Sequence, residues 1–232
     1  MTASDLWVTQ FYQRIQQPPA LFIVISGPSG VGKTALLRRM REMGAPLHFV
    51  ITATSRAPRP GEVNGADYHF VSPARFEEMI ADHELLEHAV VYGEYKGIPR
   101  RQVEEALASG RDVIVSLDVQ GAHTIRQLAP GALLIFLTAG SEAELTQRLQ
   151  GRATEDPEAL ARRLATAHAE LQRADEFDYV VLNGEGCLDR AVEQVRCILQ
   201  AEKCRVDARR VVLGQPAAAL VEEGEDDAQG AV

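Results

Sequence analysis

The pattern G-x-x-x-x-G-K-T at residues 27–34 constrains this chain more than any other feature of its sequence. A continuous apolar run at 21–26 precedes it, and a helical pattern closed by Gly44 follows it. Such an apolar run is typical of a strand buried on both faces of a parallel sheet. A glycine-rich turn between a buried strand and a helix predicts an α/β core with an anion-binding turn.

The residue types in this turn suit the phosphates of a nucleoside triphosphate. Glycines let backbone N–H groups converge on phosphate oxygens, Lys33 can reach the β- and γ-phosphates, and the Thr34 hydroxyl can ligate Mg²⁺. We therefore predict an ATP site with Mg²⁺ as cofactor, formed by Gly27, Pro28, Ser29, Gly30, Val31, Gly32, Lys33 and Thr34. The alternative is a turn that merely joins strand to helix, but such a turn needs no lysine and hydroxyl together.

Three further apolar runs repeat the buried-strand signature and alternate with helical patterns; they lie at 113–117, 133–137 and 179–182. This alternation predicts a parallel sheet with helices on both faces, the three-layer α/β/α architecture of P-loop proteins. The segment 52–98 breaks the alternation with repeated prolines and glycines, so we expect an inserted subdomain. The core then comprises 21–51, 99–147 and 164–204.

The two ends of the chain differ from the core in composition. We expect residues 1–20 to form an N-terminal extension that packs through its aromatic side chains. Residues 205–232 hold too few apolar side chains to offset ordering entropy, which predicts a disordered acidic tail.

Charge and composition exclude several classes of protein. Of the net charge of -9, five charges lie in the last twelve residues, and a mildly acidic body argues against binding nucleic acid. No apolar stretch is long enough to cross a membrane, and the N-terminus lacks the basic region of a secretory signal, so we expect a cytoplasmic protein. The three cysteines show no CxxC spacing, which argues against a metal or disulfide site.

Two other places carry candidate site residues. Asp118 ends a buried run and fits either an acidic partner near Mg²⁺ or the acceptor, or the N-cap of the next helix. In the insertion, Arg56 and Arg59 lie three apart ahead of Tyr68. Arginine forks suit a phosphomonoester, and a solvated basic loop is the alternative.

Several specific segments follow one another along the chain: the phosphate loop, the segment T-S-R-A-P-R-P-G-E-V-N-G-A-D-Y-H-F-V-S, and L-D-V-Q-G at 117–121. They are followed by R-L-Q-G-R at 148–152 and A-D-E-F-D-Y-V-V at 174–181. In these segments, and from about Leu21 to about Lys203, the sequence resembles the guanylate kinase family. The resemblance implies a core, a GMP-binding insertion at 52–98 and a mobile lid at 148–163.

By position, the resemblance implies a role for each matching residue. Arg56, Arg59 and Tyr68 would hold the GMP phosphate, with Thr52 nearby, and Glu87 would accept hydrogen bonds from guanine. The matched lid arginines, which would act on the transferring phosphoryl group, are Arg148, Arg152 and Arg163. Without the resemblance, Arg148 and Arg152 could be an ordinary exposed helix face.

The sequence departs from the family pattern at four positions. Lys96 replaces a tyrosine that assists at the GMP phosphate, and we expect it to act there through its charge. Ile98 replaces a hydroxyl expected at guanine O6, Ser116 stands where a second acidic residue is frequent, and Ala35 replaces a small hydroxyl residue.

The resemblance implies a nucleoside monophosphate kinase that converts ATP and GMP to ADP and GDP in purine nucleotide recycling. Two alternatives stay open: a kinase of this fold with another phosphate acceptor, and a non-catalytic guanylate-kinase-like binding module. The intact Lys33 and Thr34 argue against the binding module. The sequence gives no oligomeric state.

Overall fold

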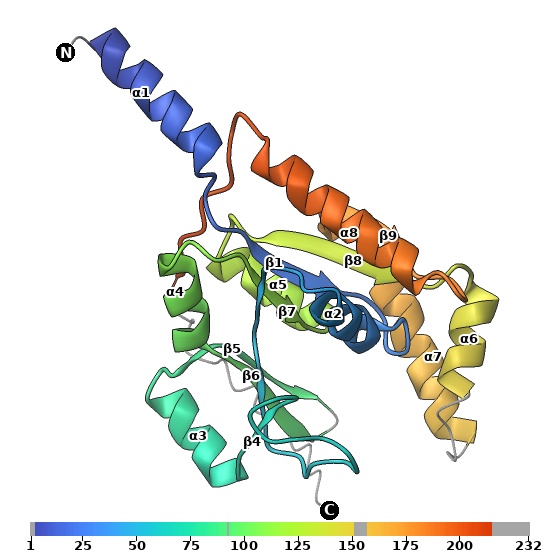
Figure 1. The fold of residues 1–232 in the computed structure, drawn as a ribbon. Coiled ribbons are helices and arrows are strands. Elements are labelled where there is room, and N and C mark those ends of the chain that lie inside the picture. The colour runs from blue at the N-terminus through green and yellow to red at the C-terminus, as the bar shows by residue number, and fades with distance from the viewer. Residues whose placement is uncertain (1–2, 92, 151–156, 215–232) are drawn as a thin grey trace, which may run out of the picture.

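The computed structural model describes residues 3–91, 93–150 and 157–214, whose strands form two sheets (Figure 1). The larger sheet is parallel, in the order β2-β7-β1-β8-β9. Its strands are β1 (Phe22–Ser26), β2 (His48–Phe49), β7 (Val113–Ser116), β8 (Leu133–Thr138) and β9 (Tyr179–Leu182). The three inner strands are buried almost throughout, which explains why they read as continuous apolar runs.

Helices cover both faces of this sheet. Alternate residues of β1 point to opposite faces: Ile23 and Ile25 join the core under α2 (Lys33–Glu42) and α8 (Leu188–Lys203). Phe22 and Val24 join the core under α4 (Arg100–Ala108) and α5 (Val119–Leu128). The predicted three-layer α/β/α core is therefore confirmed.

The insertion forms a second sheet of its own, in the order β4-β3-β6-β5. Its elements are β3 (Ala53–Thr54), β4 (His69–Phe70), α3 (Pro73–Ala81), β5 (Leu85–Val91) and β6 (Glu94–Pro99). A small core holds it together, in which Phe76 of α3 stacks on Tyr95 at 5.0 Å between ring centroids. In Figure 1 this subdomain lies below the central sheet, on the side of β7.

The chain between β8 and β9 folds at the carboxyl end of the central sheet. It contains α6 (Glu142–Gln150), α7 (Pro157–Leu171) and the 3₁₀ turn η1 (Ala174–Glu176). Leu145 and Leu149 of α6 join the core next to the loop between β1 and α2. Residues 151–156 of the predicted lid, Arg152 among them, lie outside the described residues.

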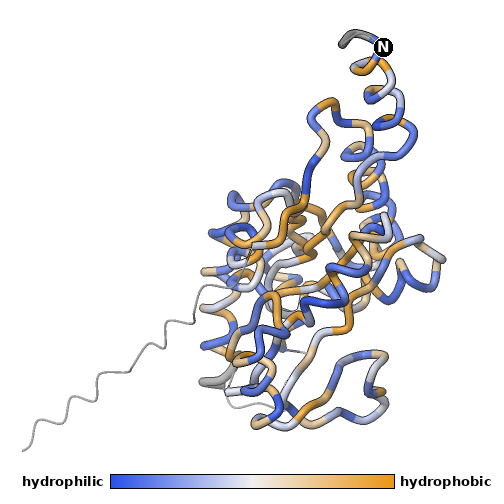
Figure 2. The backbone as a smooth tube through the Cα atoms, turned by 90° about the vertical axis from the view of Figure 1, so that its left-hand side faces the viewer, coloured by the Kyte–Doolittle hydropathy of each residue, from blue (hydrophilic) through white to orange (hydrophobic). Residues whose placement is uncertain are grey.

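The N-terminal helix α1 (Ala3–Gln16) projects away from the body of the protein (Figures 1 and 2). Trp7 stacks on Phe11 at 5.3 Å within the helix and is 62% exposed. The expectation that this extension packs through its aromatic side chains was therefore wrong, because they meet one another and solvent. No helix in the described ranges has the length and apolar character needed to span a membrane.

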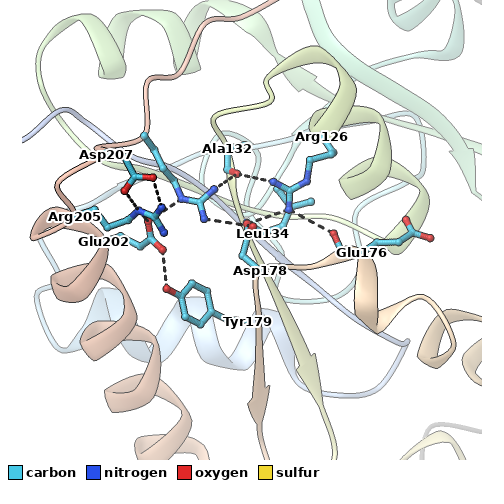
Figure 3. Close-up of polar contacts among 10 residues, drawn as sticks. Arg126, Ala132, Leu134, Glu176, Asp178, Tyr179, Glu202, Arg205 and Asp207 are labelled. Carbon is cyan, nitrogen blue, oxygen red and sulfur yellow. Dashed lines mark hydrogen bonds and ion pairs between the residues drawn. The ribbon is translucent and has the colours of Figure 1, made fainter.

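Residues 205–214 follow a defined path, whereas their composition led us to expect disorder from residue 205. Val211 and Leu213 pack against the core under α4 and α5, and Gly214 N donates to Leu128 O at 2.7 Å. Arg209 pairs with the buried Glu202 at 2.8 Å and with Asp178 at 3.3 Å, in the polar network of Figure 3. Residues 205–214 are therefore ordered by contacts with a core that the rest of the chain forms, although they contain too few apolar side chains to form a core themselves.

Candidate active site

The glycine-rich loop lies where β1 ends and α2 begins, and its backbone at three positions has a conformation that favours glycine. Gly27, Gly30 and Gly32 have φ angles of 134°, 87° and 97°. A Cβ on Gly27 would lie 2.0 Å from the carbonyl oxygen of Leu137, and one on Gly32 would lie 2.5 Å from Nδ2 of Asn183. The positive φ angles and the close neighbours therefore both exclude side chains here.

Lys33 begins α2 and folds back over the loop. Its Nζ donates hydrogen bonds to the carbonyl oxygens of Gly27 and, at 3.0 Å, Pro28. Thr34, one residue further into the first turn, is exposed. An ammonium group, a helix N-terminus and a glycine-rich backbone thus meet at one point, an arrangement suited to several linked phosphates.

Asn183 and Arg148 hold the middle of the loop through one carbonyl oxygen. Val31 O accepts from Asn183 Nδ2 at 2.7 Å and from Arg148 Nη1 at 3.3 Å. Arg148 Nη2 also donates to Asn183 O at 2.8 Å and to Glu144 Oε1. Arg148 is therefore not part of an exposed helix face, because it ties α6 to the loop backbone.

Asp118 caps α5, as the structural alternative for this residue predicts. Its Oδ1 accepts a hydrogen bond from Gly121 N at 2.7 Å, which satisfies a free N–H group of the first helical turn. A Cβ on Gly121 would lie 3.4 Å from Asp118 Oδ1 and 3.1 Å from Glu87 Oε1, so the two carboxylates lie close together. Asp118 can therefore cap α5 and still present its charge at the carboxyl edge of the central sheet.

Glu170 of α7 is a residue that the sequence analysis did not single out. Burial raises the pKa of its carboxyl group, while the charge of Lys33 and a hydrogen bond from the Ser29 backbone oppose that rise. Arg163 lies seven residues earlier on the same helix, so the two share a face. In the sequence, Glu170 could have been found only through this spacing, which puts Arg163 and Glu170 on one helix face. The structure adds that Ala167, between them, is buried.

Arg56, a predicted phosphate-binding residue of the insertion, is enclosed, with 8% of its side chain exposed. It pairs with Glu62 at 2.6 Å and lies over the rings of Tyr68 and Phe70. Arg59 is exposed, while Thr52 and Lys96 are half-buried. Lys96 lies opposite Thr54 on β6, facing the strand that leads to Arg56.

Glu87 is buried in β5, with 5% of its surface exposed. Burial, helped by the charge of Asp118, raises its pKa to about 8. A Cβ on Gly121 would lie 3.1 Å from Glu87 Oε1, so the glycine of the L-D-V-Q-G segment makes room for this carboxylate. Glu87 and Asp118 thereby connect the insertion to the carboxyl edge of the central sheet.

Ile98 lies directly opposite Glu87 across β5 and β6, but its side chain is fully buried in the core under α4 and α5. The expectation that Ile98 stands in place of a hydroxyl at the base stays a prediction, and the structure adds that this position lies beside Glu87 within the core. A bulge between Leu85 and Glu87 shifts the register of the strand pair here. Ser116 is half-buried at the end of β7.

A pocket of about 460 Å³ opens between α6, α7 and the end of β8. Its lining includes Thr138, Leu145, His168 and Gln172, and it contains none of the predicted site residues. The candidate active site therefore rests on the loop, the carboxylates and the arginine of the insertion, and not on the volume of a cavity.

Comparisons with known proteins point to one family. The family model described as guanylate kinase matches residues 20–202. A protein named guanylate kinase 2, chloroplastic/mitochondrial, from Oryza sativa subsp. japonica is 52% identical over 84% of this chain and 68% of its own length. A guanylate kinase from Gloeobacter violaceus is 46% identical over 83% of this chain and 95% of its own. The crystal structure of guanylate kinase from Anaplasma phagocytophilum covers 84% of this chain and 90% of its own, at 27% identity and a TM-score of 0.66.

Proposed function

The chain belongs to the guanylate kinase family, and from this premise we propose that it transfers the γ-phosphoryl group of ATP to GMP, giving ADP and GDP. The observation that carries the proposal is the pairing of two sites on one side of the central sheet. A glycine loop with Lys33 folded over it faces one substrate, and an insertion with Arg56 and the buried Glu87 faces the other. Such an enzyme serves purine nucleotide recycling.

We assign ATP to the loop formed by Gly27, Pro28, Ser29, Gly30, Val31, Gly32, Lys33 and Thr34. Backbone N–H groups and the N-terminus of α2 bind phosphate oxygens, and Lys33 exchanges its carbonyl partners for the β- and γ-phosphates. Asn183 and Arg148 support this role because they hold the Val31 carbonyl and so fix the direction of the neighbouring N–H groups.

Mg²⁺ is the cofactor that the donor atoms here suit. Thr34 offers an exposed hydroxyl at the first turn of α2, and Mg²⁺ prefers oxygen ligands with several places left for phosphate or water. Across the described ranges, no three His, Cys, Asp or Glu side chains gather into a metal site, so most ligands would come from the nucleotide and water. The ion would supply charge neutralisation on the phosphates.

The insertion is proposed to bind GMP through both ends of the nucleotide, its phosphate and its base. Arg56, Arg59 and Tyr68 take the phosphate, with Thr52 and the cation of Lys96 nearby. Glu87 accepts hydrogen bonds from the N1–H and 2-amino groups of guanine, which adenine does not present together. The carboxylate form is needed for this, since a protonated carboxyl group donates at one of its oxygens.

Catalysis by these residues is a matter of positioning and charge. The GMP phosphate is already ionised, so no strong general base is required, and an in-line approach depends on holding the two phosphates in place. Lys33, Arg148, Arg152 and Arg163 are proposed to offset charge on the transferring group, the last three as members of a lid at 148–163. Asp118 is proposed to act beside the acceptor while it caps α5.

A coupled assay for ADP release with five acceptors tests the proposal: GMP, dGMP, AMP, UMP and CMP, each with ATP and Mg²⁺. We expect GMP to be phosphorylated with the highest kcat/KM. A better acceptor beside negligible GMP turnover would show a kinase of another specificity. No diphosphate from any acceptor would leave a non-catalytic member of the family.

The cellular location and the partners of the protein are proposed from the sequence. The cytoplasmic location expected from the sequence stays a prediction, because the rice relative carries an organellar name. No nucleic-acid or membrane partner is proposed, and the oligomeric state is left open.

A further inference from the structure

One end of the Arg56 guanidinium group is occupied by Glu62. Nη1 donates to Glu62 Oε2 at 2.7 Å and Nη2 donates to Glu62 Oε1 at 2.6 Å, a bidentate pair. Nη1 also donates to the Ala57 carbonyl oxygen at 2.9 Å. Three of the five N–H groups of Arg56 are therefore held by the insertion itself.

Two aromatic rings fix the plane of the same guanidinium group. Its central carbon lies 4.9 Å from the ring centroid of Tyr68 and 5.4 Å from that of Phe70, and the two rings are tilted by 52° to one another. With 8% of the side chain exposed, Arg56 has little room to change rotamer. The carboxylate and the rings together form a socket for Arg56, consisting of Glu62, Tyr68 and Phe70.

The socket leaves one edge of the guanidinium group available. Nε–H and the second N–H of Nη2 lie side by side, on the edge that Glu62 does not use. Within the described ranges no hydrogen bond of Arg56 uses Nε. The Tyr68 hydroxyl lies close enough to contribute, after Glu62, to the raised pKa of Arg56. Two parallel donors of this kind match two oxygens of a phosphate group.

Glu62 is itself held in place. Its Oε2 accepts from Arg59 N at 2.8 Å, and the turn that follows is closed by Val63 N to Asp67 Oδ2 at 2.8 Å. The hydrogen bonds from Arg56 lower the pKa of Glu62 to about 2, so it stays ionised at every pH at which the enzyme would work. The socket thus presents a fixed negative charge to the Nη1–Nη2 edge of Arg56.

We propose that Glu62 is a positioning residue, which holds Arg56 so that its Nε–Nη2 edge points at the phosphate of the acceptor nucleotide. This rests on the proposed function, since it names how that site grips its phosphate. Glu62 does not compete for the phosphate, because it binds the Nη1–Nη2 edge of the guanidinium group and leaves the Nε–Nη2 edge to the phosphate. It removes the rotamer freedom that a long side chain would otherwise lose on binding.

The test is the Glu62→Gln variant, which keeps the shape of the side chain and removes its charge. Its matched control is Glu84→Gln, which breaks another arginine–glutamate pair of the same subdomain, on the outer surface, where Arg75 Nη2 donates to both carboxylate oxygens of Glu84 at 2.8 Å. Affinities for GMP and guanosine are measured by calorimetry, with kcat alongside. We expect roughly 10- to 100-fold weaker GMP binding in Glu62→Gln, with a raised KM for GMP, and unchanged guanosine binding and kcat. Glu84→Gln should match the unmodified protein.

A double-mutant cycle shows whether Glu62 acts through Arg56. In an Arg56→Ala background, Glu62→Gln should weaken GMP binding no further. Tighter GMP binding by Glu62→Gln would show a competitor for the phosphate, and an equal loss for guanosine would show a general structural role. Either result, or additive losses in the cycle, overturns the proposal.

Guanosine binding measures the fraction of correctly folded sites in each variant. A misfolded variant would lose guanosine binding as well as GMP binding, and so would differ from the expected result. Should the unmodified protein bind GMP no more tightly than guanosine, the proposed phosphate site fails whatever Glu62 does. In that case the positioning role fails with it. Should the unmodified protein discriminate and Glu62→Gln discriminate equally, only the positioning role fails.

Discussion

Replacing Glu87 with glutamine should remove a loss of stability that the unmodified protein undergoes as the pH rises. The unfolded-state pKa of a glutamate is about 4.5, and in the folded protein burial, with Asp118 beside it, raises the pKa of Glu87 to about 8. The folded state therefore keeps a proton that the unfolded state loses, and stability falls between these two values by about 1.4 kcal/mol per pH unit. At pH 7 the unfolded state has gained about 3 kcal/mol from this carboxyl group.

The Glu87→Gln variant lacks this titration. The difference in unfolding free energy between the variant and the unmodified protein should therefore grow by about 3 kcal/mol from pH 5.5 to pH 7.5, whatever constant offset the new amide introduces. Urea unfolding followed by circular dichroism at four pH values measures it, with Glu84→Gln as the control for losing an exposed negative charge. A difference independent of pH would refute the argument, because Glu87 would then be ionised in the folded state.

Four other outcomes are expected. At pH 7, GMP binding should release about one proton from Glu87, seen as calorimetric heats that depend on the ionisation enthalpy of the buffer; equal heats in all buffers would contradict a protonated carboxyl group. Lys33→Ala should lower kcat at least 100-fold with an unchanged melting temperature, and near-normal kcat would exclude Lys33 from catalysis. Ile98→Ser should cost about 3 kcal/mol by urea unfolding, because its side chain is fully buried; a lower KM for GMP in this variant would show that a hydroxyl here reaches the base, and an unchanged KM would exclude that role. Arg209→Ala should cost about 3 kcal/mol, since it leaves the buried Glu202 short of a partner; a neutral result would show that residues 205–214 do not stabilise the fold.

The sequence alone was sufficient for the architecture and the phosphate loop. Buried parallel strands are apolar along their whole length, so the runs around Ile23, Ile114 and Ile135 marked the inner strands without further information. The glycines of the loop are required by backbone conformation and close contact, so their spacing identifies the phosphate loop in the sequence before the fold is known. The family resemblance extended this to the substrates.

Only the tertiary structure decided how individual side chains are used. Asn183 and Arg148 meet at the Val31 carbonyl although they come from distant parts of the chain, because parallel strands end at one edge of the sheet. No local pattern encodes such a meeting. The pairing of Arg56 with Glu62 lies within one short segment, yet which edge of the guanidinium group it covers depends on how the turn folds.

Burial explains the remaining differences. Ile98 lies opposite Glu87 in the strand pair, and its side chain is enclosed by the core under α4 and α5, a burial that the local sequence does not reveal. Glu87 is likewise an ordinary acid in the sequence and an unusual one in the fold, since its pKa is set by the loss of water around it. Periodicity and motifs specify which residues face inward, whereas the solvation of each group is a property of the assembled structure.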